Sequence, residues 1–232
     1  MPGHTVAIGA LVTAGAALLP DVDHHNSTIA HSGGAVTRAV AGVAERAAGG
    51  HRHGLHSLLA IAGFYFGATY LGSWRHEVPV LGDVPAGSAL MFLALVAFAL
   101  KALKLSKGGI ARLWLTALAG TVAILYFAPD QLEWLPTSIL LGVIVHLVGD
   151  FLTVGGLPLL WPWIPKPPRA LDSVPVLRSI WQSNGYVAIP VLGKTGSARE
   201  WLLCSALTLY VLVAIAGAVS SIAGANLPLP GA

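Results

Sequence analysis

Three short polar clusters interrupt a chain that is otherwise strongly apolar. They cover residues 19–25, 51–57 and 146–150, and histidine and aspartate recur in them. Only 10% of the chain is charged and 55% is hydrophobic. Ionisable groups beside such apolar segments are costly to hold, and they indicate a functional site. Imidazoles and carboxylates are ligands for zinc, manganese and iron in proteins, so the clusters predict a metal centre.

The first cluster places Asp21, Asp23 and His24 directly after Pro20. Because proline stops or kinks a helix, these side chains can converge from a turn and offer two oxygens and a nitrogen to a metal. The alternative is a polar helix end in which Asp23 caps the segment that follows.

The second cluster surrounds the start of an apolar run. His51 and His56 are five residues apart, and His53 adds a third imidazole between them. We expect Arg52 and Ser57 to contact the oxygens of a bound substrate, since a helix N-terminus favours anions. The alternative is an interfacial, weakly basic loop with solvated histidines.

The third cluster pairs His146 with Asp150 at helical i and i+4 positions, which lie on one face of a helix. This spacing lets both side chains bind one metal, or lets Asp150 bridge two. The alternative is a polar contact between membrane helices. Thr153 follows where the helix should end and is a further candidate substrate contact.

The predicted ligands exceed what one tetrahedral zinc needs and approach the number that two metals use. We therefore expect one or two divalent ions, with zinc as the first choice and manganese or iron as alternatives. The predicted ligand set is Asp21, Asp23, His24, His51, His56, His146 and Asp150.

Two polar residues outside the clusters stay open as additional members. His4 would lie about 25 Å from Asp21 along a straight helix, which is too far to share a metal. Glu200 belongs to the stretch 197–200, whose sequence fits a helix capping box.

Composition places these clusters in a membrane protein. Soluble domains carry about 25% charged residues, far above the value here. Apolar runs of roughly 20 residues can cross the hydrocarbon core of a bilayer, which is about 30 Å thick. We predict an all-α, polytopic membrane helix bundle that forms a single domain over residues 1–232. The six expected spans are residues 5–19, 55–74, 87–105, 110–128, 137–152 and 201–225.

Two segments between the spans should lie at the membrane surface. Residues 26–50 have small apolar residues at helical spacing and predict an amphipathic interfacial helix that Gly49 and Gly50 end. The proline-rich section 161–200 should be irregular chain on the cytoplasmic side. Residues 5–19 also have the length of a signal-peptide core, but no Lys or Arg precedes them, so we expect them to be retained.

Lysine and arginine set the expected orientation. They gather in residues 20–54, 101–112 and 161–200, and these loops should therefore face the cytoplasm, with both termini outside. All three polar clusters then fall on the cytoplasmic side. The basic residues lack the aromatic interleaving of a nucleic-acid surface, so no nucleic-acid partner is expected. The single cysteine, Cys204, allows no disulfide within the chain.

These motifs resemble the YdjM-like family of LexA-regulated inner-membrane proteins, which are regarded as metal-dependent hydrolases. The resemblance rests on His4, residues 19–24, residues 51–57 and the stretch 146–162, and residues 195–200 resemble the family's last polar element. It implies a bacterial inner-membrane location and a metal-dependent hydrolase whose ligands come from these motifs. It leaves the substrate unsettled.

The first functional hypothesis is a hydrolase that cleaves a phosphoester of a lipid or lipid-linked substrate at the cytoplasmic interface. A water activated by the bound metal would attack, with His53 and Asp23 as candidate assistants. Arg52 would bind a substrate phosphate by a two-pronged contact. The alternatives are a divalent-metal transporter or sensor that uses the same ligands, and a scaffold whose histidines respond to pH. The sequence leaves the oligomeric state open.

Overall fold

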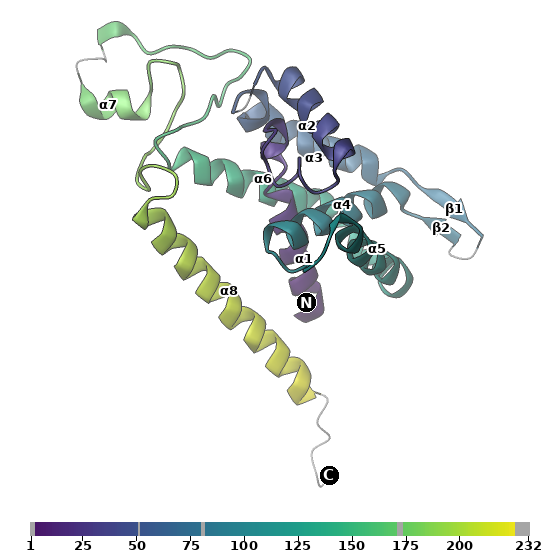
Figure 1. Cartoon of the computed structure of the whole chain (residues 1–232). Helices are drawn as coiled ribbons and strands as arrows, with labels where there is room; N and C mark the ends of the chain where they lie inside the picture. The colour runs from purple at the N-terminus through teal and green to yellow at the C-terminus, as the bar shows by residue number, and fades with distance from the viewer. Residues whose placement is uncertain (1–2, 51, 80–81, 171–173, 226–232) are drawn as a thin grey trace.

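The six apolar runs form six helices in the computed structural model, which describes residues 3–50, 52–79, 82–170 and 174–225 (Figure 1). This confirms the all-α prediction, and the helix ends lie close to the expected ones. The helices are α1 (Gly3–Ala16), α3 (Leu58–Gly72), α4 (Ala86–Ala102), α5 (Ile110–Phe127), α6 (Leu135–Phe151) and α8 (Ala198–Ala225).

The helices differ in how much of a bilayer they can cross. Four stretches are long and apolar enough to span it: Val6–Asp23, Ile110–Phe127, Pro129–Phe151 and Ala198–Gly217. The helices α3 and α4 have 15 and 17 residues. At 1.5 Å per residue they reach about 22 and 25 Å, somewhat short of the roughly 30 Å hydrocarbon core. The predicted six spans therefore correspond to four long helices and two shorter apolar ones.

Close packing of α1 against α4 and α6 forms the centre of the bundle. Val12 and Val143 are fully buried in this core. A Cβ at Gly15 would come within 3 Å of the backbone of Leu95, and a Cβ at Gly142 would lie 2.7 Å from the Thr13 carbonyl oxygen. Glycine at these positions lets the helix backbones approach closely, as small residues do in membrane bundles. This packing fixes the end of α1 beside α6.

The chain turns sharply where α1 ends. Pro20 opens a short 3₁₀ helix, η1 (Pro20–Asp23), and the amphipathic helix α2 (Ala35–Ala48) follows after a series of turns. Gly49 ends α2 in the left-handed conformation with φ of 81°, as the sequence predicted. Val36, Val40 and Val43 are exposed along one side of α2. An exposed apolar stripe of this kind suits a helix that lies in the membrane interface.

The section after α6 is mostly irregular, with one short helix, α7 (Pro175–Ile180). It folds back on itself and on the end of α6 through backbone hydrogen bonds. Val154 N–H donates to the Gly193 carbonyl, Leu157 and Val187 exchange two such bonds, and Ile189 N–H donates to the Phe151 carbonyl. We call residues 153–197 the strap. A short antiparallel hairpin, β1 (His76–Val78) and β2 (Gly82–Val84), was not predicted from the sequence.

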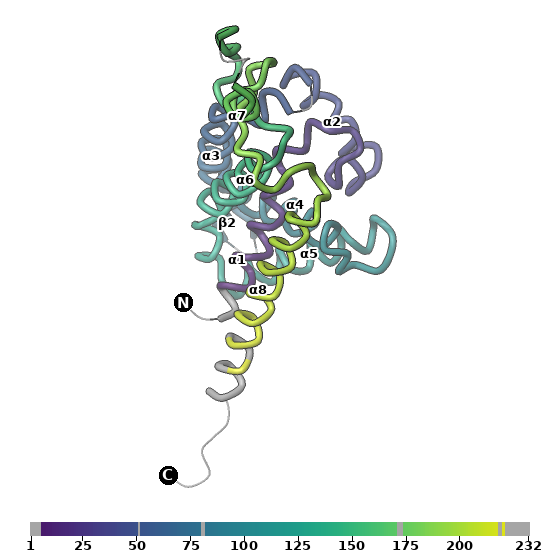
Figure 2. The backbone as a smooth tube through the Cα atoms, turned by 90° about the vertical axis from the view of Figure 1, so that its left-hand side faces the viewer, coloured from purple at the N-terminus to yellow at the C-terminus, as the bar shows by residue number. Residues whose placement is uncertain are grey.

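The last helix, α8, lies beside α1 at the edge of the bundle. Its stretch Ala198–Gly217 contains no buried residue. Figures 1 and 2 show α8 running downward from the strap, so that its C-terminal end points away from α2 and α7. The N-terminus of α1 lies toward the same lower end. The start of α1 and the end of α8 thus lie on the same side of the bundle. An even number of membrane crossings has the same consequence.

Candidate metal centre

Three segments that are far apart in sequence meet at one end of the bundle. They are η1, a second 3₁₀ helix η2 (Gly54–His56) and the C-terminal half of α6. Ser57 fixes the turn that carries His56: its hydroxyl donates to the Gly54 carbonyl at 2.7 Å and accepts the Ala60 N–H at 3.2 Å. This is the N-cap arrangement that serine favours, and it holds η2 at the start of α3.

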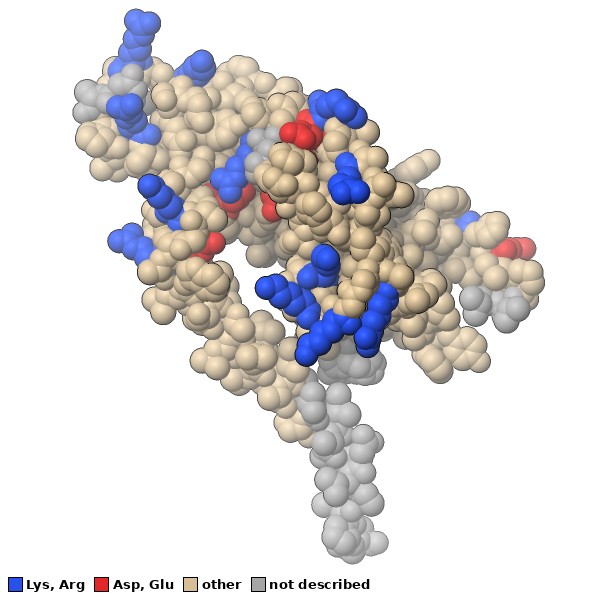
Figure 3. All heavy atoms as spheres, in the orientation of Figure 1, with Lys and Arg blue, Asp and Glu red and all other residues tan. Residues whose placement is uncertain are grey.

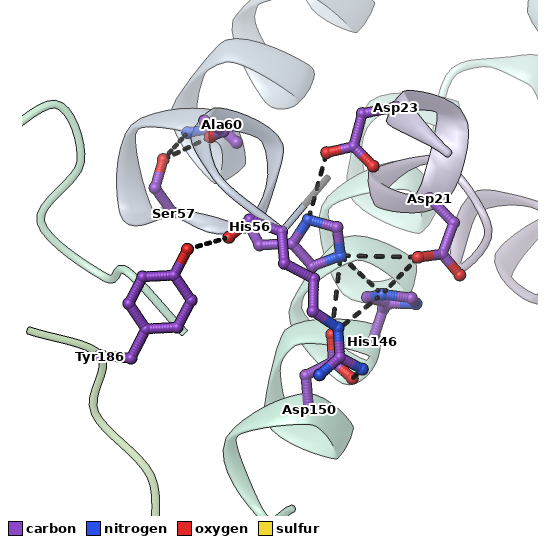
Figure 4. A network of polar contacts seen from close by, with 10 residues as sticks. Asp21, Asp23, His56, Ser57, Ala60, His146, Asp150 and Tyr186 are labelled. Atoms are coloured by element: carbon purple, nitrogen blue, oxygen red, sulfur yellow. Dashed lines mark hydrogen bonds and ion pairs between the residues drawn. The ribbon is translucent and has the colours of Figure 1, made fainter. Parts of the chain in front are cut away.

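Two imidazoles and a carboxylate converge between these segments (Figure 4). The Nε2 atoms of His56 and His146 are 3.3 Å apart. The Oδ1 atom of Asp21 lies 3.5 Å from His56 Nε2 and 3.7 Å from His146 Nε2. Within the part of the chain that the structure describes, this is the one group of three such residues close enough to hold a metal ion.

Asp150 adds a fourth oxygen to this group. Its Oδ2 lies 3.6 Å from both His56 Nε2 and His146 Nε2, so the i, i+4 pair predicted on α6 does face one point. Its Oδ1 accepts a hydrogen bond from the Arg52 guanidinium at 2.8 Å. The buried Oδ2 has no hydrogen-bond partner among the described residues. A buried oxygen of this kind requires a partner, and a bound cation would supply one.

The spacing of these atoms fits a small cation. Four ligands bound tetrahedrally at zinc-like bond lengths lie about 3.3–3.6 Å from one another. The two Nε2 atoms are 3.3 Å apart, and each lies 3.5–3.7 Å from the Asp21 and Asp150 oxygens. The donor set of imidazole and carboxylate also suits a divalent transition metal. The residues present therefore fit such an ion.

The charges around His56 also favour a bound cation. Burial by itself disfavours the charged imidazolium, but the carboxylates of Asp21 and Asp23 outweigh that effect and raise the pKa of His56 from 6.5 to about 9. The His56 side chain is fully buried. Carboxylates gathered around a buried ring thus favour a positive charge at this point, whether a proton or a metal supplies it.

Asp23 lies on the far side of His56. Its Oδ2 is 3.6 Å from the Nδ1 of His56, whereas the Nε2 of that ring faces Asp21 and His146. Asp23 is fully buried there. Both aspartates were predicted as ligands, but residues two apart on a 3₁₀ helix point in different directions. Asp23 occupies the position of the carboxylate that commonly orients a metal-binding histidine.

A family model described as YdjM inner membrane protein matches residues 2–221. The chain belongs to the YdjM family. This confirms the resemblance seen in the motifs and the inner-membrane character of the protein. No curated protein and no solved structure matches the chain.

A further predicted ligand of this YdjM protein, His24, lies outside the converging group. The Nδ1 of His24 accepts the Asn26 N–H at 3.1 Å, and its ring stacks on His25. The chain has already turned away from the centre there, since η1 ends at Asp23. His51 lies outside the described residues.

The three residues predicted to contact substrate form hydrogen bonds or ion pairs within the protein. The Ser57 hydroxyl forms the helix cap described above, and the buried Thr153 hydroxyl donates to the Asp150 carbonyl at 2.8 Å. Arg52 is bound to Asp150 but retains 28% exposure of its side chain. Of these three residues, Arg52 is the one whose polar group both reaches the centre and stays partly open.

The strap contributes a residue that sequence reasoning missed. The Tyr186 hydroxyl donates to the Arg52 carbonyl at 3.1 Å, and its ring meets the edge of the His53 ring. Arg52 needs such support because it is a non-glycine residue with φ of 58°. Tyr186 belongs to no motif and lies 134 residues away in sequence, so no local pattern could have identified it.

The sequence left undecided whether His4 and Glu200 join the site, and both lie away from the metal centre. His4 is in the first turn of α1, and the unbroken helix from Gly3 to Ala16 separates it from Asp21. The Glu200 carboxylate accepts the Gly196 N–H at 2.7 Å, and the Ser197 hydroxyl accepts the Glu200 N–H at 3.3 Å. These two bonds form the helix cap that the sequence predicted at the start of α8.

Proposed function

We propose that this protein is a membrane-embedded, metal-dependent hydrolase with one divalent ion held by Asp21, His56, His146 and Asp150. The observation that carries the proposal is the buried Oδ2 of Asp150, which faces both imidazole nitrogens at 3.6 Å. Zinc is the first choice because imidazole and carboxylate are ligands that it commonly binds, with manganese or iron as alternatives. A divalent ion bound there would lower the pKa of a coordinated water and polarise a substrate oxygen.

A single ion accounts for the described ligands better than two. Asp23 and His24 belong to the ligand set expected for one or two ions, but Asp23 faces the other side of His56 and His24 lies beyond the end of η1. Asp23 instead favours the tautomer of His56 that has its proton on Nδ1 and leaves Nε2 able to bind metal.

The charged residues beside the centre favour an anionic substrate. Arg52 is partly exposed and lies next to Asp150, so its guanidinium can bind phosphate oxygens. Hydrolysis of a phosphoester forms a new P–O bond from water, breaks the ester P–O bond and passes one proton to the leaving alkoxide. His53 is the candidate for moving that proton, because it follows Arg52 and is partly exposed. Asp23 is fully enclosed behind His56.

The position of the centre favours a membrane substrate on the cytoplasmic side. The centre lies where α6 ends and α3 begins, at the level where apolar helices give way to polar chain. Lys and Arg gather over α2, near α7 and near the α4–α5 connection, whereas most of α8 carries none (Figure 3). Basic loops mark the cytoplasmic side of a membrane protein. A lipid or lipid-linked phosphoester is therefore the proposed substrate class.

The test combines metal analysis with activity. Purified protein in nanodiscs should contain close to one transition metal per chain, and it should cleave at least one member of a phospholipid panel. Asp150→Asn should lose both, whereas Asp130→Asn, at the other end of α6, should lose neither. A metal-free preparation together with full activity of Asp150→Asn would refute the proposal. Uptake of the metal into liposomes would instead favour the transporter.

A further inference from the structure

An apolar groove runs between α3 and α4, just below the metal centre. Its cavity volume is about 240 Å³. Leu19 lies at one end, and helix α6 contributes Ile139 to its wall. Its lining also includes Gly63, Gly67 and Leu71 of α3 and Met91 of α4.

Two glycines open this groove. Gly63 and Gly67 are four residues apart, so they lie on the same face of α3. A Cβ at either position would meet nothing within 4 Å, in contrast to Gly15 and Gly142, where a Cβ would press against the backbone of a neighbouring helix. The glycines of α3 therefore do not serve helix packing within this chain. They leave a trough that the described side chains do not fill.

The groove lies along the helices that lead to the metal centre, and none of the four ligands lines it. Leu19 precedes Asp21 by two residues on the same turn. Gly63 follows His56 by seven residues and Ile139 precedes His146 by seven, which places both about 10 Å along their helices from the centre. From Gly63 to Leu71 the groove continues for about 12 Å along α3, toward the other end of that helix. Its long axis thus leads away from the ligands and into the depth of the bundle.

We propose that this groove holds one acyl chain of a membrane phospholipid whose phosphate lies at the metal centre. The inference rests on the proposed function and names its substrate class. A volume of 240 Å³ spread over about 12 Å gives a cross-section of roughly 20 Å². That width suits a single hydrocarbon chain, whereas a helix about 10 Å in diameter would occupy roughly 80 Å². The helices on both sides are apolar, so an acyl chain from the bilayer enters without losing hydrogen bonds.

The test labels the chain that enters the groove. A phosphatidylglycerol with a diazirine midway along one acyl chain is placed in nanodiscs with the protein, and irradiation is followed by mapping of the modified peptides. Modification should concentrate on α4 around Met91 and Phe98, which line the groove. Gly67→Leu fills the trough and should reduce that labelling at least tenfold, and Gly63→Leu should do the same. The control Gly120→Leu, on α5, also adds a side chain in open space and should change nothing.

Two results would overturn the groove as an acyl-chain site. One is equal labelling of α4, α5 and α8, as expected of lipid that merely surrounds the protein. The other is a crosslink between the α3 helices of two copies that Gly67→Leu abolishes, which would make the glycines a dimer contact. Metal content and lipid turnover are measured on the same samples. Groove labelling without turnover supports the groove and counts against the hydrolase, whereas turnover with diffuse labelling does the reverse.

Discussion

At the scale of single residues, the centre depends on how each ligand is held as well as on where it lies. Asp21 faces the converging nitrogens, while Asp23 contacts the opposite nitrogen of His56. Asp23→Asn should therefore weaken metal binding by about 10–100-fold, as loss of an orienting carboxylate does. Asp21→Asn removes a ligand and should weaken binding more. Titration against a competing chelator measures both, and equal affinities for the two variants would contradict the assigned roles.

The proton on His56 gives a pH dependence with a definite sign. The pKa of His56 is raised to about 9 in the folded protein, above the ordinary 6.5. In metal-free protein this proton contributes up to about 3 kcal/mol of stability, fully present below pH 6.5 and lost as the pH rises through 9. A metal must displace the proton, so its affinity should rise about tenfold per pH unit between pH 7 and 9.

Thermal unfolding in detergent tests this pair of expectations. The Tm of metal-free protein should fall between pH 7 and 9, while the gain in Tm on adding zinc should grow over the same range. His56→Gln should remove both trends. A gain in Tm that is independent of pH in the unaltered protein would show that zinc and the proton do not compete at His56.

At the scale of elements, the position of Asp21 relative to His146 is set by how closely α1 packs on α6. A Cβ at Gly142 would lie 2.7 Å from the α1 backbone, whereas one at Gly149, on the same helix, would meet nothing within 4 Å. Gly142→Ala should therefore cost about 1–3 kcal/mol and loosen metal binding, because the helices must move apart. Gly149→Ala should leave the Tm unchanged or slightly higher. Equal effects of the two variants would contradict this.

The strap is the second element that sets the centre. Tyr186→Phe removes the hydrogen bond to the Arg52 carbonyl, which should cost about 0.5–1.5 kcal/mol and free Arg52 from its left-handed conformation. Binding of inorganic phosphate should weaken, while metal affinity should change little, since Asp21, His56 and His146 stay in place. Tyr65→Phe, on α3, is the matched control. Equal phosphate affinity in the two variants would show that the strap does not position Arg52.

The sequence predicted the long helices well because each spans many apolar residues: residues 110–128 were expected and Ile110–Phe127 is observed. The hairpin at His76–Val84 and the helix α7 were missed, since a few backbone bonds hold such short elements and leave no periodicity. Residue types predicted that His56, His146 and the aspartates meet. They could not separate Asp21 from Asp23, because that distinction depends on the direction of one 3₁₀ turn.

At the scale of the whole molecule, the apolar surface and the basic loops together define how the chain sits in the bilayer. The apolar stretch of α8 from Ala198 to Gly217 contains no buried residue and needs a hydrocarbon environment. The helices α2 and α7 lie toward the end of the molecule opposite the C-terminal part of α8 (Figures 1 and 2). One side of the membrane therefore receives the centre together with its basic surroundings.

The rule that basic loops face the cytoplasm makes this orientation testable with single cysteines. In a Cys204→Ser background, Asp130→Cys, between α5 and α6, should react with a membrane-impermeant maleimide in intact spheroplasts. Lys107→Cys, in the basic α4–α5 connection, should react only after lysis. Both positions are exposed, so accessibility within the protein does not limit either reaction. The opposite pattern would place the metal centre on the outer side, where a substrate of the cytoplasmic leaflet could not reach Arg52 and Asp150.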